Sequence, residues 1–183
     1  MRRVPYPVAI ITATDPSSTA DTSFRGMTVS SFNTVTLSPT PIISFNVRRP
    51  SETLNALLAS GRFLVHLLVP SPETATLARD FSKGNITLAS MLSGHGTFEF
   101  GKLEGDAEQP LPMLRRREAG LPGVHFPFVF ECALLPQKID VYDHSIVLGE
   151  VVRVLEGAEV EGEAGRLCLT YADTKFWKMG EQV

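Results

Sequence analysis

Hydrophobic residues along the chain fall mostly in short runs rich in Val, Ile and Phe, and these runs end at proline, glycine or polar clusters. Such runs are typical of β-strands. They predict strands at 7–14, 27–37, 41–48, 62–69, 126–136, 144–156, 166–171 and 175–179.

Helical spacing of apolar residues is found in two segments. In the first, Ser51 suits an N-cap, Gly61 suits the C-terminal stop, and one face carries Leu54, Leu57 and Leu58. The second opens on Ser71-Pro72-Glu73, a cap followed by a proline and an acidic first turn, and its apolar side carries Leu77, Ala78 and Phe81.

Between the second helix and the next strand, residues 82–125 form a long irregular loop insertion in which we expect at most a short helix around 113–118. The strands do not alternate with helices, so a parallel α/β sheet is excluded. So many short strands would expose many edges, which closure into a barrel removes. The sequence therefore predicts one mainly β domain over 1–183, a barrel with the helices as external caps.

Composition restricts the possible partners. A length of 183 residues with 43% hydrophobic and 20% charged residues suits one folded domain. The net charge of −3 gives no basic excess for binding nucleic acid. The longest uncharged run, 4–16, is too short and too rich in proline to span a membrane, so we expect no membrane partner.

The two cysteines, Cys132 and Cys168, lie far apart among apolar residues and are expected to be buried free thiols in a reducing compartment. No secretory signal is visible. We therefore expect an intracellular location, cytoplasmic or organellar, with the mitochondrion an option if the natural N-terminus carries a targeting segment.

A run of hydroxyl residues follows Gly26. If 27–37 is one strand, Thr28, Ser30, Phe32, Thr34 and Thr36 share one face, which shows four hydroxyls and one ring rather than an apolar stripe. A large planar ligand could lie along this face. The alternative is a solvent-facing side of a strand, where threonine is common.

A second polar cluster, 46–53, lies where a predicted strand meets a helix N-terminus. Arg48 and Arg49 together with the hydroxyls of Ser51 and Thr53 would suit a phosphate there. The alternative is ordinary capping by Ser51 beside two solvated arginines. Ser82 and Lys83, just past the second helix, could serve the same ligand or simply form a loop.

The histidines share no metal-ligand spacing, so no metal site is expected. His66 is interpreted as a core imidazole bonded to backbone rather than as a ligand. The run 115–117 of three arginines is either a solvated face or a docking patch.

Four segments, in order, resemble the flavin reductase-like, FMN-binding split-barrel family: 26–32 (GMTVSSF), 44–48 (SFNVR) with Ser51 and Thr53, 61–63 (GRF), and 143–151 (DHSIVLGEV). The resemblance spans nearly the whole chain. It departs at 65–68, where the family often reads Asn-Val-Leu and this chain has Val-His-Leu-Leu, so no ring contact is assigned to that strand.

The resemblance implies a mainly β split barrel of Greek-key type with two or three peripheral helices, forming a homodimer that binds FMN, or FAD, near the subunit interface. It assigns contact with the isoalloxazine ring to Thr28, Val29, Ser30 and Ser31, and contact with the ribityl and phosphate groups to Asn46, Arg48, Ser51 and Thr53. It places His144 near the nicotinamide of NAD(P)H; the alternative for His144 is a surface histidine at the start of a strand.

These expectations make the chain an NAD(P)H:flavin oxidoreductase in which hydride passes to flavin N5. The two nucleotides carry that chemistry, so no catalytic triad is expected. The alternative is a non-catalytic flavin-binding or assembly module built on the same barrel, because fold alone does not separate the two.

Overall fold

The computed structural model describes residues 2–18, 23–84, 91, 96–103, 109–117, 125–156 and 168–180. Its main sheet is antiparallel, with strand order β3-β2-β6-β9-β10-β5-β4. The members are β2 (Ala9–Thr14), β3 (Phe24–Val29), β4 (Asn33–Thr36), β5 (Ile42–Arg48), β6 (Arg62–Leu67), β9 (Phe128–Val141) and β10 (His144–Glu156).

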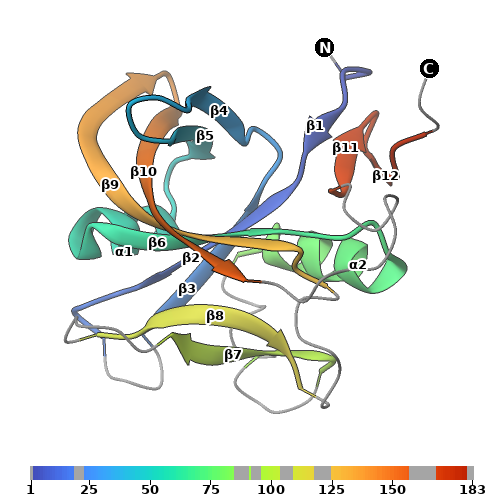
Figure 1. Ribbon diagram of the computed structural model, residues 1–183, viewed down its shortest axis with the longest axis horizontal. Helices are drawn as coiled ribbons and strands as arrows, with labels where there is room; N and C mark the ends of the chain where they lie inside the picture. Colours follow the sequence, from blue (N-terminus) through green and yellow to red (C-terminus); the bar gives the residue numbers. More distant parts are fainter. Residues whose placement is uncertain are drawn as a thin grey trace.

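Two smaller sheets and two helices complete the described fold. One sheet has the order β1-β11-β12, and the other is a hairpin of β7 and β8. These elements are β1 (Tyr6–Pro7), β7 (Phe98–Leu103), β8 (Leu111–Arg116), β11 (Thr170–Ala172) and β12 (Lys175–Trp177). The helices α1 (Glu52–Ser60) and α2 (Pro72–Phe81) lie at different ends of the main sheet (Figure 1).

The main sheet curls into a split barrel, which confirms the mainly β fold class. Its long strands β9 and β10 bend strongly (Figure 1). The end strand β3 comes into contact with β5, yet among the described strands no hydrogen-bonded ladder joins them. The expectation that hydrogen bonding closes the sheet is therefore wrong: the barrel stays open between β3 and β5.

Successive side chains along the central strands point to opposite faces of the sheet, so the core has two layers. On β2, Ala9, Ile11 and Ala13 pack into the barrel with residues of α1, whereas Ile10 packs outward against α2 and the β7–β8 hairpin. All six residues of β2 are buried. A strand covered on both faces reads as a continuous apolar run, which is why the sequence marks β2 and β6 so clearly.

The β7–β8 hairpin is held to the barrel by side chains. Thr14 and Thr12 donate hydrogen bonds to the carbonyl oxygens of Pro110 and Pro112, each at 2.6 Å. Next along β8, the Leu114 N–H donates to Nε2 of His66 at 3.1 Å. Alternate residues from Pro110, just before β8, to Leu114 are thus anchored by three buried side chains from β2 and β6.

This hairpin corrects the expectation that 82–125 is irregular. Part of that segment forms β7 and β8, and Leu111–Arg116 is a strand where a short helix was expected around 113–118. The prolines at Pro110 and Pro112 weaken the strand pattern, but here their carbonyls serve as acceptors. Residues 85–90, 92–95, 104–108 and 118–124 of the predicted loop lie outside the described residues.

The predicted strand 27–37 is also corrected, because it is two strands. β3 ends at Val29 and β4 begins at Asn33, with a bend over 30–32 between them. The proposed row of hydroxyls from Thr28 to Thr36 therefore does not share one face.

Both predicted helices are confirmed, with their caps. The Leu54 N–H donates to Oγ of Ser51, and α1 ends on Gly61 at φ 68°. In α2, Ser71 and Thr74 form a capping box. The described strands also include β9, which runs five residues beyond the predicted end at 136, to Val141.

Both cysteines are free, as expected. Cys132 is buried, and burial raises the pKa of its thiol to about 12. The expectation of burial is wrong for Cys168, which is only partly buried. The described helices include none of the length and apolar character needed to span a membrane.

Candidate flavin site at the split of the barrel

A cavity of about 400 Å³ lies at the open side of the barrel, where β3, the end of β5 and the two helices meet. We call it the cradle. It brings together seven residues that the sequence predicted from three separate segments: Thr28, Val29, Asn46, Arg48, Ser51, Thr53 and Ser82. Such convergence of polar groups on one concave site is typical of ligand binding.

The α1 end of the cradle is suited to an anion. Ser51 caps the helix, and the first-turn N–H groups that follow it carry the positive end of the helix dipole. Arg48 lines the same end from the last residue of β5. Glu52 also lines it, so a phosphate there must keep its oxygens toward Arg48 and the N–H groups rather than toward that carboxylate.

His144 stands beside this end on the rim. It pairs in register with Arg48 across β10 and β5, and Asp143 lies between their side chains. Asp143 accepts from Nε of Arg48 at 3.1 Å and bonds Nδ1 of His144 at 2.7 Å. These contacts lower the pKa of Asp143, and the hydrogen bond with His144 has the largest effect. Because Nδ1 is engaged, Nε2 is the His144 nitrogen left to meet a ligand, although His144 does not line the cradle itself.

Two of the predicted hydroxyl side chains join the elements that surround the cradle. Thr28 Oγ1 donates to the carbonyl of Ala78 at 2.7 Å, which joins β3 to α2. Ser31 Oγ accepts from the Asn46 N–H at 2.8 Å, which joins the bend after β3 to β5. Both hydroxyls thus bond to the backbone of a neighbouring element, and Ser31, unlike Thr28, does not line the cradle.

Lys83 and Ser30 lie apart from the cradle. Lys83 pairs with Asp80 at 3.0 Å, although its neighbours Ser82 and Gly84 both line the cavity. Ser30 faces an adjoining cavity instead. The cluster predicted from the sequence is therefore partly separated.

Sequence reasoning missed Phe81 as a wall residue, along with Gly26. A Cβ at Gly26 would lie 2.4 Å from Cε1 of Phe81, so the Phe81 ring packs directly on the glycine backbone. Both line the cradle. A glycine in a strand is itself a signal that another group approaches the backbone closely, and Gly26 is such a signal, two residues before Thr28.

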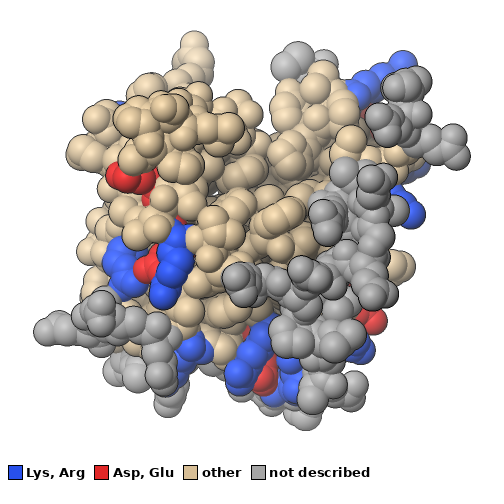
Figure 2. Space-filling model, viewed as in Figure 1, with Lys and Arg blue, Asp and Glu red and all other residues tan. Residues whose placement is uncertain are grey.

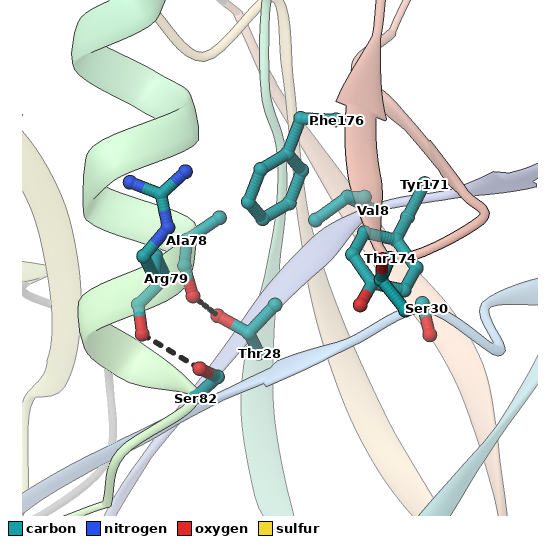
Figure 3. Close-up of a pocket in the computed structure, with 9 residues that line it drawn as sticks. All are labelled: Val8, Thr28, Ser30, Ala78, Arg79, Ser82, Tyr171, Thr174 and Phe176. Carbon is teal, nitrogen blue, oxygen red and sulfur yellow. Dashed lines mark hydrogen bonds between the residues drawn. The ribbon is translucent and has the colours of Figure 1, made fainter.

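The adjoining cavity, which we call the annex, was also missed. It has a volume of about 270 Å³ and lies between α2 and the β11–β12 hairpin (Figure 3). The residues that line it are Val8, Thr28, Ser30, Ala78, Arg79, Ser82, Tyr171, Thr174 and Phe176. No sequence motif joins the C-terminal hairpin to the cradle, because only the fold brings them together.

His66 does not take part in the site. It is fully buried in the core, with its ring edge-to-face against Phe126, which supports the interpretation of a core imidazole. In the described ranges, no group of three or more His, Cys, Asp or Glu side chains is arranged to hold a metal ion. Charged side chains on the face in Figure 2 gather in small groups of mixed sign rather than in one basic field.

Comparison with known proteins agrees with this arrangement. The family model described as "Flavin reductase like domain" matches residues 1–180. A relative from Rhodococcus qingshengii, "NADH:FMN oxidoreductase", is 29% identical over 178 residues, which cover 97% of this chain and 78% of the relative.

Two solved structures share the fold over almost the entire chain. Flavin reductase HpaC, complexed with NADP+, superposes with a TM-score of 0.68 at 25% identity, covering 98% of this chain and 93% of its own. The NADH:FAD oxidoreductase SgcE6 of Streptomyces globisporus gives 0.67 at 23% identity, covering 99% and 84%. With a family model matched from residue 1 to residue 180, the chain belongs to the flavin reductase-like family.

Proposed function

We propose that the chain is an NAD(P)H-dependent flavin reductase that binds FMN, or FAD, in the cradle. The observation that carries the proposal is the cradle itself: residues from β3, β5, α1 and α2 meet at the split, with a cation and a helix N-terminus at one end. The names of the relatives support the same pair of substrates, a flavin and a nicotinamide nucleotide.

The residues present fit a phosphorylated flavin. Arg48 and the capped start of α1 would bind the phosphate, and Ser51 and Thr53 would flank it. Asn46 would meet the ribityl chain, and the stretch from Thr28 to Ser31 would lie along the ring. When bound, flavin supplies the hydride acceptor, its N5.

The protein's part in the reaction is then to bind and orient. Thr28 and Ser31, tied to α2 and β5, keep the walls of the cradle in place so that the ring is held in one plane. Asp143 fixes the orientation of the His144 ring. The contact of Nε2 of His144 with the nicotinamide, which the family resemblance implies, stays a prediction, because His144 stands beside the phosphate end of the cradle rather than beside the ring.

The proposal is tested by the absorption spectrum of the purified chain with FMN. On anaerobic addition of NADH or NADPH we expect the flavin bands to bleach. Flavin that is bound but not bleached by either nucleotide would contradict the enzymatic proposal and favour the non-catalytic flavin-binding module.

We also propose that the protein is a homodimer. Large apolar side chains are exposed on the main sheet: Val35 on β4, and Ile139 and Val141 on β9, with Val152 and Val154 farther along β10. In Figure 2 the region over β4 and the upper bend of β9 and β10 shows few charged side chains. Apolar patches of this kind mark protein interfaces. A second copy of the chain is the proposed occupant.

Sedimentation of the wild type should therefore give about twice the chain mass of 20.0 kDa. Val35→Glu places a charge in the patch and should shift the protein toward the monomer. Leu58→Glu, at an exposed leucine on α1, is the control and should leave the dimer intact. A wild type that sediments as a monomer would contradict the proposal.

An intracellular location is proposed with the same function. Free thiols at Cys132 and Cys168 support a reducing compartment.

A further inference from the structure

The annex adjoins the cradle. Thr28 and Ser82 line both cavities, so the two share one wall at the α2 side of the cradle. The shared wall lies away from the α1 end, where the phosphate of a flavin is proposed to bind. A ligand in the annex would therefore meet the ring portion of a flavin rather than its phosphate.

The far wall of the annex is aromatic. Tyr171 and Phe176, one from each strand of the C-terminal hairpin, pack edge-to-face with ring centroids 5.3 Å apart. Both are only partly buried. Figure 3 shows the Phe176 ring directed between α2 and Val8. Partly exposed aromatic rings on a concave wall offer a surface on which a planar base can stack.

The near wall carries a cation. The guanidinium carbon of Arg79 lies 5.7 Å from the centroid of the Phe176 ring. In the part of the chain that the structure describes, Arg79 forms no ion pair with an acidic side chain, whereas Arg48 is paired with Asp143. Its charge is thus available to an anionic ligand at the mouth of the annex. Ser30 and Thr174 add hydroxyls on the opposite side.

An aromatic wall beside a cation and hydroxyls matches one chemical class, a base that carries a sugar and phosphate. The volume, about 270 Å³, is at the small end for a ligand pocket, so the annex suits one half of a dinucleotide rather than the whole. The reaction itself requires the nicotinamide to lie against the flavin ring.

We propose that the annex binds the adenosine phosphate end of the nicotinamide nucleotide, with the base against Phe176 and the phosphates at Arg79. This inference rests on the proposed function. It makes Arg79 and Phe176 specificity-determining residues for the nucleotide, and it gives the C-terminal hairpin, far from the flavin-binding segments in sequence, a role in binding the reductant.

The chain carries its own reporter for the test. Trp177 is the single tryptophan, and it neighbours Phe176 on β12 with its indole N–H bonded to the carbonyl of Ala172. Titration of the wild type with NAD+ should change its fluorescence to saturation. ADP-ribose should give the same change, and nicotinamide mononucleotide should not.

Two variants test the assignment. Arg79→Gln removes the cation, and Phe176→Leu removes the ring while keeping apolar volume. Each is expected to weaken NAD+ binding about 10-fold or more and to raise KM for NADH by a similar factor, while kcat and the dissociation constant of FMN stay within about 2-fold. Lys175→Ala is the matched control: it removes an exposed cation from the same hairpin that does not line the annex, and should change neither ligand.

Two results would overturn the inference. If the variants weaken FMN and leave NAD+ unchanged, the annex holds the edge of the flavin ring instead. If they bind both ligands like the wild type, it holds neither. Failure of the proposed function is distinct from both, because it would show as a wild type whose flavin neither NADH nor NADPH bleaches.

Discussion

Replacing Arg48 with alanine is expected to weaken FMN binding by about 10-fold or more and to change riboflavin binding little. The two ligands differ only in the phosphate, and Arg48 is the cation that lines the phosphate end of the cradle. A charge-assisted hydrogen bond contributes roughly 1.5–3 kcal/mol, and because the Arg48 side chain is 78% exposed we expect the lower end of that range. Fluorescence titration of both flavins gives the ratio.

Arg115→Ala is the matched control for this experiment. Arg115 is also an exposed arginine paired with a carboxylate, Glu99, but it lies on the β7–β8 hairpin, away from the cradle. It should leave both flavins bound as in the wild type. Equal weakening of FMN and riboflavin by Arg48→Ala would show that Arg48 does not bind the phosphate.

His66→Leu is expected to lower the free energy of unfolding at pH 7.5 by about 1–3 kcal/mol. Nε2 of His66 accepts the Leu114 N–H, so Nδ1 carries the proton and faces the carbonyl of Ile10 at 3.3 Å. Leucine would leave the buried Leu114 N–H without a partner. Urea unfolding followed by circular dichroism measures the loss.

The same substitution should change the pH dependence of stability. Burial lowers the pKa of His66 to about 4, whereas an unfolded histidine titrates near 6.5. The folded-state pKa is the lower one, so the unfolded chain takes up the proton first. The contribution of neutral His66 is present above pH 6.5 and is lost as the pH falls toward 4, by roughly 3 kcal/mol over the whole interval. His66→Leu should abolish this part of the slope.

Thr12→Val serves as the control for the pH effect. It removes another anchor of the hairpin, the hydrogen bond to Pro112, without removing a titrating group. It should lower stability and keep the wild-type slope between pH 4 and 6.5. If His66→Leu keeps the wild-type slope as well, His66 is not the group that titrates.

Much of this fold could be predicted from the sequence because its elements are locally marked. The helices α1 and α2 have caps at Ser51, Gly61 and Ser71, and these signals lie within a few residues of each helix. The strands β2 and β6 are buried on both faces and read as continuous apolar runs.

The β7–β8 hairpin could not be predicted in this way. Its strand β8 contains Pro112, and its contacts with the barrel come from Thr12 and His66, about 100 and 50 residues away in the sequence. The division of the predicted strand 27–37 into β3 and β4 also depends on a distant contact. Ser31 bonds the backbone of Asn46, a tertiary contact that replaces local strand geometry.

The residues of the candidate site also fall into those that local sequence marks and those that only the fold brings together. Residues in contiguous segments, such as Asn46 to Thr53, carry a readable pattern at a strand and helix junction. The fold then adds what no local pattern holds: the packing of Phe81 on Gly26, the turn of Lys83 away to Asp80, and the approach of Phe176 to α2.

The central claim is that the split between β3 and β5 binds a phosphorylated flavin. A crystal structure of the chain grown with FMN tests it most directly. We expect the phosphate within hydrogen-bond distance of Arg48 and the first N–H groups of α1, and the ring beside the bend that follows β3. A phosphate bound elsewhere, or a cradle filled by the protein's own side chains in the presence of saturating FMN, would contradict the account.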